Sequence, residues 1–198
     1  MRKETSEITD IVRSRICQRA DQEDMILHEG MLATEFGVSR TPIRQVLQKL
    51  AYEHLVETRS GIGTIVSPLL PEHRPMDFAV FRSLLRAAAD CTCDATLPDL
   101  AATRLATVQR QAAAPEDRIA PVYFSQRSEL LEILSDLVKD RILADALRAA
   151  HWRHLRWRMR DLSDAPEPVV ADWRATMAAV PEAPSLRQLM LTLADAPF

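Results

Sequence analysis

Three helices and two short strands are predicted by the spacing of apolar residues in the first third of the chain. Apolar residues recur every three or four positions over residues 5–20, 28–36 and 39–51, which is the period of an amphipathic helix. Residues 55–58 and 64–66 instead alternate or branch at Cβ, and a glycine-containing turn separates them. This order of elements predicts a small helical domain that ends in a β-hairpin.

The pattern changes after Gly63. The rest of the chain has no glycine, is rich in Ala, Leu and Arg, and is divided by prolines, which favours about five or six helices over sheet. A proline-rich stretch over residues 68–75 marks the linker. We therefore expect a mostly α protein, with a winged helix-turn-helix over residues 1–70, a linker at 71–75 and an all-α antiparallel helical bundle over 76–198.

Composition and charge narrow the class of protein. Apolar residues make up 47% of the chain and charged residues 27%, and no stretch approaches the roughly 18 apolar residues of a membrane span, so we expect a soluble globular protein. Met1–Thr5 lack the apolar core of a signal peptide, which predicts a cytoplasmic location. The net charge of −3 means that affinity for nucleic acid must come from local placement of Arg and Lys. Because the chain lacks a glycine-rich phosphate loop, a nucleophile elbow and a Ser/His/Asp set at recognisable spacing, we expect no enzyme.

The strongest chemical signal is a helix-turn-helix over residues 32–50. Gly37 suits the left-handed residue that ends the first helix, and apolar residues from Ile43 to Leu50 share the buried face of the second. The opposite face is rich in hydrogen-bond donors, at Arg40, Thr41, Arg44, Gln45 and Gln48. Such a helix fits the major groove of DNA, where an arginine can bind guanine through two hydrogen bonds. By itself this face is equally typical of a solvated surface, but the hairpin that follows it as a wing favours DNA binding.

These elements resemble the DNA-binding domain of the GntR superfamily of bacterial regulators over roughly residues 8–68. The matching motifs are Leu27-x-Glu29-x-x-Leu32-Ala33, Phe36-Gly37-Val38-Ser39-Arg40-Thr41-Pro42-Ile43-Arg44, Leu47-x-x-Leu50-Ala51 and Gly61-x-Gly63-x-x-Val66. The resemblance implies a homodimer that binds double-stranded DNA at a short palindromic operator, most often as a repressor. The expected DNA-binding residues are Ser39, Arg40, Thr41, Arg44, Gln45 and the wing residue Gly61.

Two departures from the family pattern lie before the recognition helix. The family often has a basic residue after Glu29, where this chain has Gly30. Its usual glycine-proline turn before the second helix is replaced by Asp21–Met25. Both departures bear on the phosphate contacts of the second helix, and neither touches the recognition helix.

Residues 76–89 resemble, less closely, the opening helix of the FCD type of effector domain, which is an antiparallel helical bundle. Asp77, Arg82 and Leu85 fit that pattern, whereas Arg86 replaces its glutamate. The resemblance implies a domain that dimerises and binds an effector.

Many FCD domains hold a divalent metal with one Asp and three His, and the metal holds a carboxylate effector. The family's Asp-x-x-Phe-His motif aligns with residues 121–125, where Pro121 and Ser125 replace two ligands. A third ligand aligns with Trp173, and the chain has no histidine after His154. Since these ligands are absent, we predict no metal site of the family type and no cofactor.

Without a metal, two interpretations of the helical domain remain. In the first, basic side chains hold a small anionic metabolite in the bundle interior, and Arg82 is the leading candidate. Arg82 is equally consistent with a residue that pairs with a carboxylate or lies at the surface. In the second interpretation, effector binding has been lost, and the domain serves dimerisation or the docking of a protein partner.

Residues 148–160 form an unusual segment rich in Arg and Trp. One stripe is apolar, at Trp152, Leu155 and Met159, and another is basic, at Arg153, Arg156 and Arg160. In the simplest interpretation, the apolar stripe faces the core and the basic stripe faces solvent. The alternatives are a grip for an anionic ligand or an acidic protein, or half of a metal site at His151-x-x-His154.

Overall fold

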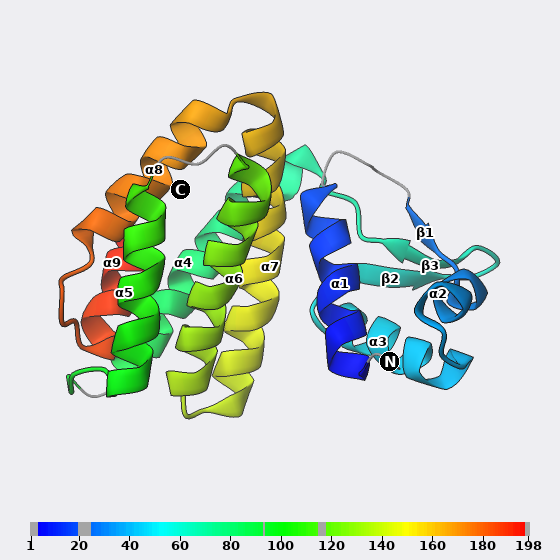
Figure 1. Ribbon diagram of the computed structural model, residues 1–198, viewed down its shortest axis with the longest axis horizontal. Coiled ribbons are helices and arrows are strands. Elements are labelled where there is room, and N and C mark those ends of the chain that lie inside the picture. The colour runs from blue at the N-terminus through cyan, green and yellow to red at the C-terminus, as the bar shows by residue number, and fades with distance from the viewer. Residues whose placement is uncertain (1–3, 20–24, 93, 115–117, 197–198) are drawn as a thin grey trace.

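The computed structural model describes residues 4–19, 25–92, 94–114 and 118–196. They form a winged helix and a helical bundle that lie side by side (Figure 1), which confirms the predicted mostly α fold class. Within these ranges, no helix has both the length and the apolar character needed to cross a bilayer.

The winged helix is built from three helices and a small antiparallel sheet. Its elements are α1 (Thr5–Gln18), β1 (Ile26–Leu27), α2 (Glu29–Phe36), α3 (Arg40–Tyr52), β2 (Val56–Arg59) and β3 (Gly63–Val66). The strand order is β1-β3-β2, with Val56 opposite Val66 and Ile26 opposite Ile65. The sequence prediction lacked β1, because a strand of two residues has no period of its own and exists only through its pairing with β3.

Helix α1 covers this small core by packing against α3. Ile8, Ile43 and Leu50 are completely buried between the two helices. At the end of α2, Gly37 adopts a left-handed conformation with φ of 64°, and its N–H bonds back to the helix. Glycine takes this conformation without strain, so the chain turns sharply into α3 at the expected position.

The second domain contains six α-helices in the part of the chain that the structure describes. They are α4 (Arg74–Asp90), α5 (Asp99–Ala113), α6 (Ile119–Leu137), α7 (Arg141–Asp164), α8 (Pro166–Ala179) and α9 (Leu186–Asp195). Helix α4 packs against α7 and α9, and α6 packs against α5 and α7. Residues 71–75, which we expected as the linker, form the 3-10 helix η1 (Pro71–His73) and the first turn of α4, because proline is tolerated at the start of a helix.

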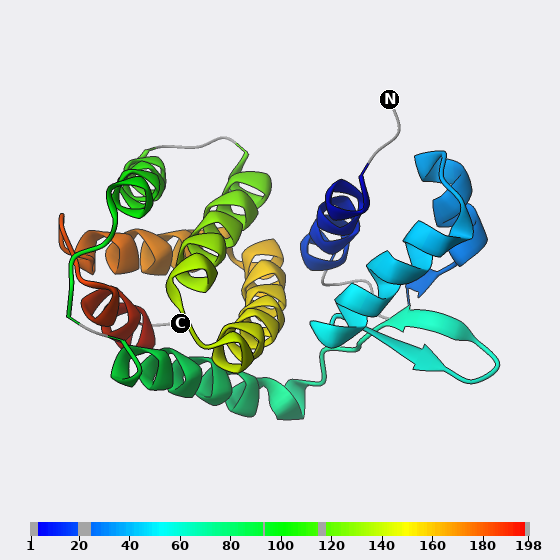
Figure 2. The ribbon, with the colours of Figure 1, turned by 90° about the horizontal axis from the view of Figure 1, so that it is seen from below.

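The two domains meet where α1 packs against α6 and α7, and α1 lies between the bundle and the rest of the winged helix (Figures 1 and 2). Arg13 of α1 donates two hydrogen bonds to Glu53, of 2.8 Å from Nε and 2.7 Å from Nη2, and both side chains are only 6% exposed. Its guanidinium also lies 4.9 Å from the ring centre of Trp152 in α7. Burial alone would lower the pKa of Arg13, but the carboxylates of Glu53 and Asp10 together outweigh this effect and raise it.

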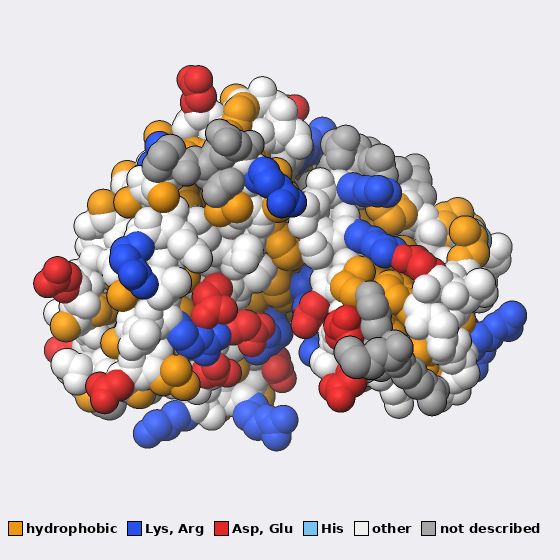
Figure 3. Space-filling view, in the orientation of Figure 1, with side chains coloured by type: hydrophobic (Ala, Val, Ile, Leu, Met, Phe, Trp, Pro, Cys, Tyr) orange, Lys and Arg blue, Asp and Glu red, His pale blue; other side chains and the backbone are white. Residues whose placement is uncertain are grey.

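On the face shown in Figure 3, acidic and basic side chains gather at the lower part of the boundary between the domains, and hydrophobic side chains line the groove above them. A cavity of about 300 Å³ lies at this boundary, lined by Asp10 and Arg13 of α1, by Glu129 and Glu132 of α6, and by Trp152. Arg156 of α7 adds a 2.7 Å hydrogen bond to the carbonyl oxygen of Ser67 in the chain that leaves the wing. The Arg156–Ser67 hydrogen bond and the contact of Arg13 with Trp152 therefore join the winged helix to the bundle.

The buried Arg13–Glu53 pair makes a stability prediction. Glu53→Ala leaves the Arg13 guanidinium buried without its bidentate partner, so we expect the free energy of unfolding to fall by about 3–5 kcal/mol. Glu35→Ala is the matched control, because it breaks the Arg15–Glu35 pair, whose side chains are 42% and 43% exposed. The control should lose less than about 1 kcal/mol. Urea unfolding followed by circular dichroism measures both losses, and equal losses would contradict a structural role for the buried pair.

Candidate nucleic-acid interface

The N-terminal half of α3 lies at the end of the molecule away from the bundle (Figures 1 and 2). The predicted DNA-binding residues of this segment are all exposed, namely Ser39, Arg40, Thr41, Arg44 and Gln45. The helix presents these side chains outward because Ile43, Val46 and Leu50 on its opposite face are completely buried. The structure therefore brings five predicted residues onto one accessible surface, and their contact with DNA stays a prediction.

The wing is the loop between β2 and β3. Gly61 and Gly63 have φ of 78° and 114°, a region that other residues rarely adopt, so two glycines allow the tight turn. Gly61 is exposed, and Ile62 beside it is 52% exposed. The wing tip thus projects at the same end of the molecule as the start of α3 (Figure 2), where a backbone amide can approach a duplex closely.

Helix α2 touches the exposed arginines of α3. The Nε of Arg44 donates a 2.9 Å hydrogen bond to Oε2 of Glu29, the first residue of α2. A Cβ atom at Gly30 would lie 3.7 Å from Nη2 of Arg40, so the Arg40 guanidinium rests beside this glycine. The other departure from the family pattern, Asp21–Met25, lies outside the described residues except for Met25.

In the bundle, helix α6 turns different residues inward from those that the family alignment suggested. Pro121 and Ser125, expected at two ligand positions, are exposed, whereas Tyr123 and Arg127 are buried. The two positions that the family alignment assigns to metal ligands therefore do not face the interior of the bundle. Trp173, aligned with a third ligand, does face the interior and is 3% exposed.

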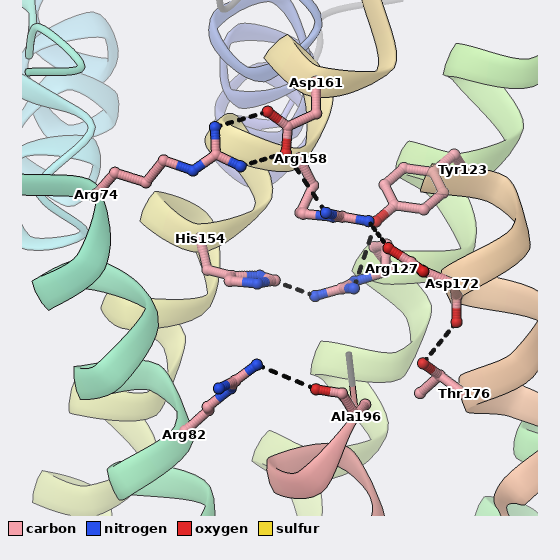
Figure 4. Close-up of polar contacts among 10 residues, drawn as sticks. All are labelled: Arg74, Arg82, Tyr123, Arg127, His154, Arg158, Asp161, Asp172, Thr176 and Ala196. Carbon is pink, nitrogen blue, oxygen red and sulfur yellow. Dashed lines mark hydrogen bonds and ion pairs between the residues drawn. The ribbon is translucent and has the colours of Figure 1, made fainter. Parts of the chain in front are cut away.

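Arg127 lies at the centre of the bundle interior and is 1% exposed (Figure 4). Its Nη2 is 3.1 Å from Nδ1 of His154, its Nη1 donates to the hydroxyl of Tyr123 at 3.4 Å, and its guanidinium lies 5.1 Å from the ring centre of Trp173. Burial lowers the pKa of Arg127, and the charge of Arg158 lowers it further. A guanidinium at this place repels a divalent cation. The described ranges contain no group of three or more His, Cys, Asp or Glu side chains that fits a metal ion.

Two histidines of α7 are buried next to Arg127. His154 stacks on Phe81 with ring centres 4.7 Å apart, and His151 meets the same ring edge-on at 5.5 Å. Burial, reinforced by the charge of Arg127, lowers the pKa of both histidines well below 6.5, so both are neutral at pH 7.

Two further arginines reach the interior from α4 and α7 (Figure 4). Nη2 of Arg82, which is half-buried, donates to the carbonyl oxygen of Ala196 at 3.2 Å. Arg158 contacts Asp161 at 3.4 Å and Asp172 at 2.9 Å. The interior of the helical domain is therefore a cationic centre rather than a cluster of acidic or imidazole metal ligands.

The basic stripe of α7 is largely covered by other elements, whereas the simplest interpretation of the sequence placed it in solvent. Arg156 is 3% exposed, and Arg153 and Arg160 are half-buried, because α7 packs against α1 as well as against the bundle. Arg153 pairs with Asp77 at 3.1 Å, and the indole nitrogen of Trp157 donates to the same carboxylate at 2.9 Å. Arg153 and Arg156, the residues suggested for docking a protein partner, are therefore engaged within the chain.

The sequence analysis did not predict the central position of Arg127. The available signal was its spacing with apolar neighbours, since Tyr123, Leu130 and Leu134 share one face of a helix with it. An arginine on such a face is ordinarily assigned to the surface, so the period alone did not reveal a buried cation.

Residues 4–66 match the family model described as bacterial regulatory proteins, gntR family. A segment of 61 residues is 38% identical to the mannosyl-D-glycerate transport/metabolism system repressor MngR of Escherichia coli (strain K12), and it covers 30% of this chain but only 25% of that repressor. Among solved structures, a transcriptional regulator GntR from Rhodococcus sp. RHA1 superposes with a TM-score of 0.60 at 19% identity, over 88% of this chain and 84% of that one. E. coli McbR/YncC superposes with a TM-score of 0.60 at 14% identity, over 98% and 92%. These two structures share the fold of this chain. MngR is named as a repressor, and the Rhodococcus protein is named as a transcriptional regulator.

The buried histidines make the stability of the protein depend on pH. In the unfolded chain each histidine binds a proton below about pH 6.5, whereas in the folded protein it stays neutral, so acid favours unfolding. The stabilisation is fully present above pH 6.5, and it should fall by about 1.4 kcal/mol per pH unit for each histidine as the pH drops below that value.

Urea unfolding between pH 7.5 and 5 measures this slope. In His151→Phe the slope below pH 6.5 should be reduced by the share of one histidine, whereas His73→Gln, at an exposed position in η1, should leave it unchanged. Identical slopes in the parent and His151→Phe would show that this imidazole titrates normally in the folded state.

Proposed function

We propose that this chain, whose residues 4–66 form a gntR-family winged helix, is a sequence-specific DNA-binding transcription regulator that acts as a repressor. The observation that carries the proposal is the exposed, donor-rich N-terminal half of α3 followed by a glycine wing at the same end of the molecule. Side chains there can enter the major groove while the wing approaches the neighbouring backbone. Because its target is chromosomal DNA, such a regulator works in the cytoplasm.

Repression and dimerisation are the finer parts of the proposal. The relative MngR is named as a repressor, and its matched segment supports the same sign of regulation here. A homodimer presents two copies of α3 to the two halves of a short palindromic operator, as the resemblance to the family implies. The operator sequence should therefore have two related half-sites.

We further propose that the helical domain, of the FCD type, responds to a small anionic metabolite without a metal. Arg82 and Arg127 supply positive charge from two different helices, and Arg158 adds to it. Charge-assisted hydrogen bonds from guanidinium groups are strong and geometrically specific for carboxylate or phosphate. The neutral histidines beside Arg127 leave the arginines as the source of the charge.

The alternative is a domain that has lost effector binding and serves only dimerisation or docking. The engagement of Arg153 and Arg156 within the chain weighs against docking through the basic face of α7. The two forms of the proposal differ in whether any small anion stabilises the protein.

Arg44→Ala tests the DNA-binding function. Loss of a bidentate contact with guanine should cost about 1–3 kcal/mol at the operator and relax the sequence preference at one position of each half-site. Fluorescence anisotropy with duplex DNA from upstream of the protein's own gene, at two salt concentrations, measures the effect. Removing one half-site should weaken binding by the parent protein if two subunits engage the operator. Equal affinity of Arg44→Ala and the parent for the operator would contradict the assignment of α3.

Thermal unfolding in the presence of a chelator tests the effector. A small mono- or dicarboxylate that binds the interior should stabilise the parent by about 2.7 kcal/mol at a concentration of a hundred times its dissociation constant. Arg82→Met should lose this stabilisation. If no carboxylate or phosphate of a test panel stabilises the protein, the domain serves dimerisation alone. If a compound stabilises the protein only when the chelator is left out, the site binds a metal.

A further inference from the structure

The first two residues of α2 lie against the exposed arginines of α3. Glu29 accepts a hydrogen bond from Nε of Arg44 at 2.9 Å, and the side chains are 35% and 64% exposed, respectively. A guanidinium carries five N–H donors in a planar fork. Because the bond to Glu29 engages Nε, the two terminal nitrogens of Arg44 are not part of this contact. They are the atoms that pair with O6 and N7 of guanine.

The contact with Glu29 changes what Arg44 can do. An arginine side chain has about 2 kcal/mol of rotamer entropy, so an exposed arginine without a fixed neighbour loses freedom when it binds a base. An acceptor at Nε restrains the plane of the guanidinium before DNA binds. It therefore lowers the loss of side-chain entropy on binding, but only for bases that Arg44 can reach in this orientation. A fixed fork favours guanine over bases that a mobile arginine would also tolerate.

Gly30 has a separate effect on Arg40. The position of a Cβ at residue 30 is 3.7 Å from Nη2 of Arg40, so one methyl group fits at ordinary contact distance, whereas a longer side chain would occupy the place of the guanidinium. The family pattern often has a basic side chain from α2 at this position. Here the guanidinium comes from the first residue of α3 instead.

We propose that Glu29 sharpens the DNA specificity of this chain by setting the orientation of Arg44, and that Gly30 supports its DNA affinity by leaving room for Arg40. Glu29 is a positioning residue that acts through Arg44, and Gly30 provides the space in which Arg40 lies. The proposal rests on the DNA-binding function proposed above.

The test of Glu29 separates its charge from its hydrogen bond. Operators are selected by the parent from a random duplex pool, and affinity is then measured by anisotropy for the selected duplex and for duplexes with single-base changes. Glu29→Ala should reduce the discrimination between guanine and the other bases at the Arg44 position by about twofold to fivefold, the range that an exposed ion pair can supply. Glu29→Gln, whose amide oxygen still accepts from Nε, should retain most of that discrimination while binding all duplexes more tightly, because a negative charge near the phosphates is removed.

Glu35→Ala is the matched control, since Glu35 lies on the same helix and pairs with Arg15 of α1. It removes the same charge but should leave base discrimination unchanged. Equal loss of discrimination in Glu35→Ala and Glu29→Ala, or unchanged discrimination in Glu29→Ala, would overturn the role of Glu29. If the parent itself selects no sequence, the DNA-binding function fails and this proposal fails with it. If Arg44→Ala loses discrimination and Glu29→Ala keeps it, only the positioning role is wrong.

A second pair of variants tests Gly30. Gly30→Ala adds only the methyl group that fits and should bind the selected duplex like the parent. Gly30→Leu, which is uncharged and long enough to displace Arg40, should weaken binding by at least about fivefold, the same loss that we expect for Arg40→Ala. Thermal unfolding of each variant shows whether the domain is intact. Parent-like affinity of a folded Gly30→Leu variant would overturn the role of Gly30.

Discussion

The burial of helix α7 from two sides is the constraint on which the rest of the structure depends. One side of this 24-residue helix faces the bundle with His151 and His154, and another faces the winged helix with Trp152 and Arg156. Moving a guanidinium out of water is expensive unless carboxylates or carbonyl oxygens receive its hydrogen bonds. The half-buried Arg153 and the buried Arg156 and Arg158 of α7 therefore each bind a partner on another segment. These contacts join α7 to α4, to the chain after the wing and to α8.

This constraint also joins the two domains. Arg13 and Glu53 form a buried pair within the winged helix, and Trp152 of α7 covers the guanidinium. His151, adjacent to Trp152 on α7, meets its indole ring edge-on with centres 5.4 Å apart and belongs to the cationic centre. Helix α7 thus touches the interior of the bundle and the base of the DNA-binding domain within one turn. A few packed side chains therefore separate the cationic centre from α1, and an effector bound as proposed would act close to the base of the DNA-binding domain.

The charged side chains at the other end of the molecule, on α3, are exposed and do not organise a core. The arginines of α3 are exposed, and the Arg44–Glu29 pair lies in solvent, where an ion pair contributes little to stability. Such side chains contribute little to the free energy of folding and are accessible to a binding partner. Buried arginines organise the helical domain, while exposed arginines are available to a polyanion. The modest net charge of −3 conceals this division, because both groups count equally in a sum.

The sequence by itself determined the winged helix, its turn at Gly37 and the helical character of everything after Gly63, because these features depend on local period and on backbone freedom at single residues. It also identified the exposed face of α3, since an amphipathic helix can bury only one face. Tertiary structure alone decided that Arg127 and Arg158 lie inside, that Glu53 pairs with Arg13 forty residues away, and that β1 exists as a strand. It also decided the phase of α6, which turned Tyr123 and Arg127 inward in place of Pro121 and Ser125. The burial of a charge depends on which distant residues surround it, and a local pattern along the chain does not contain that information.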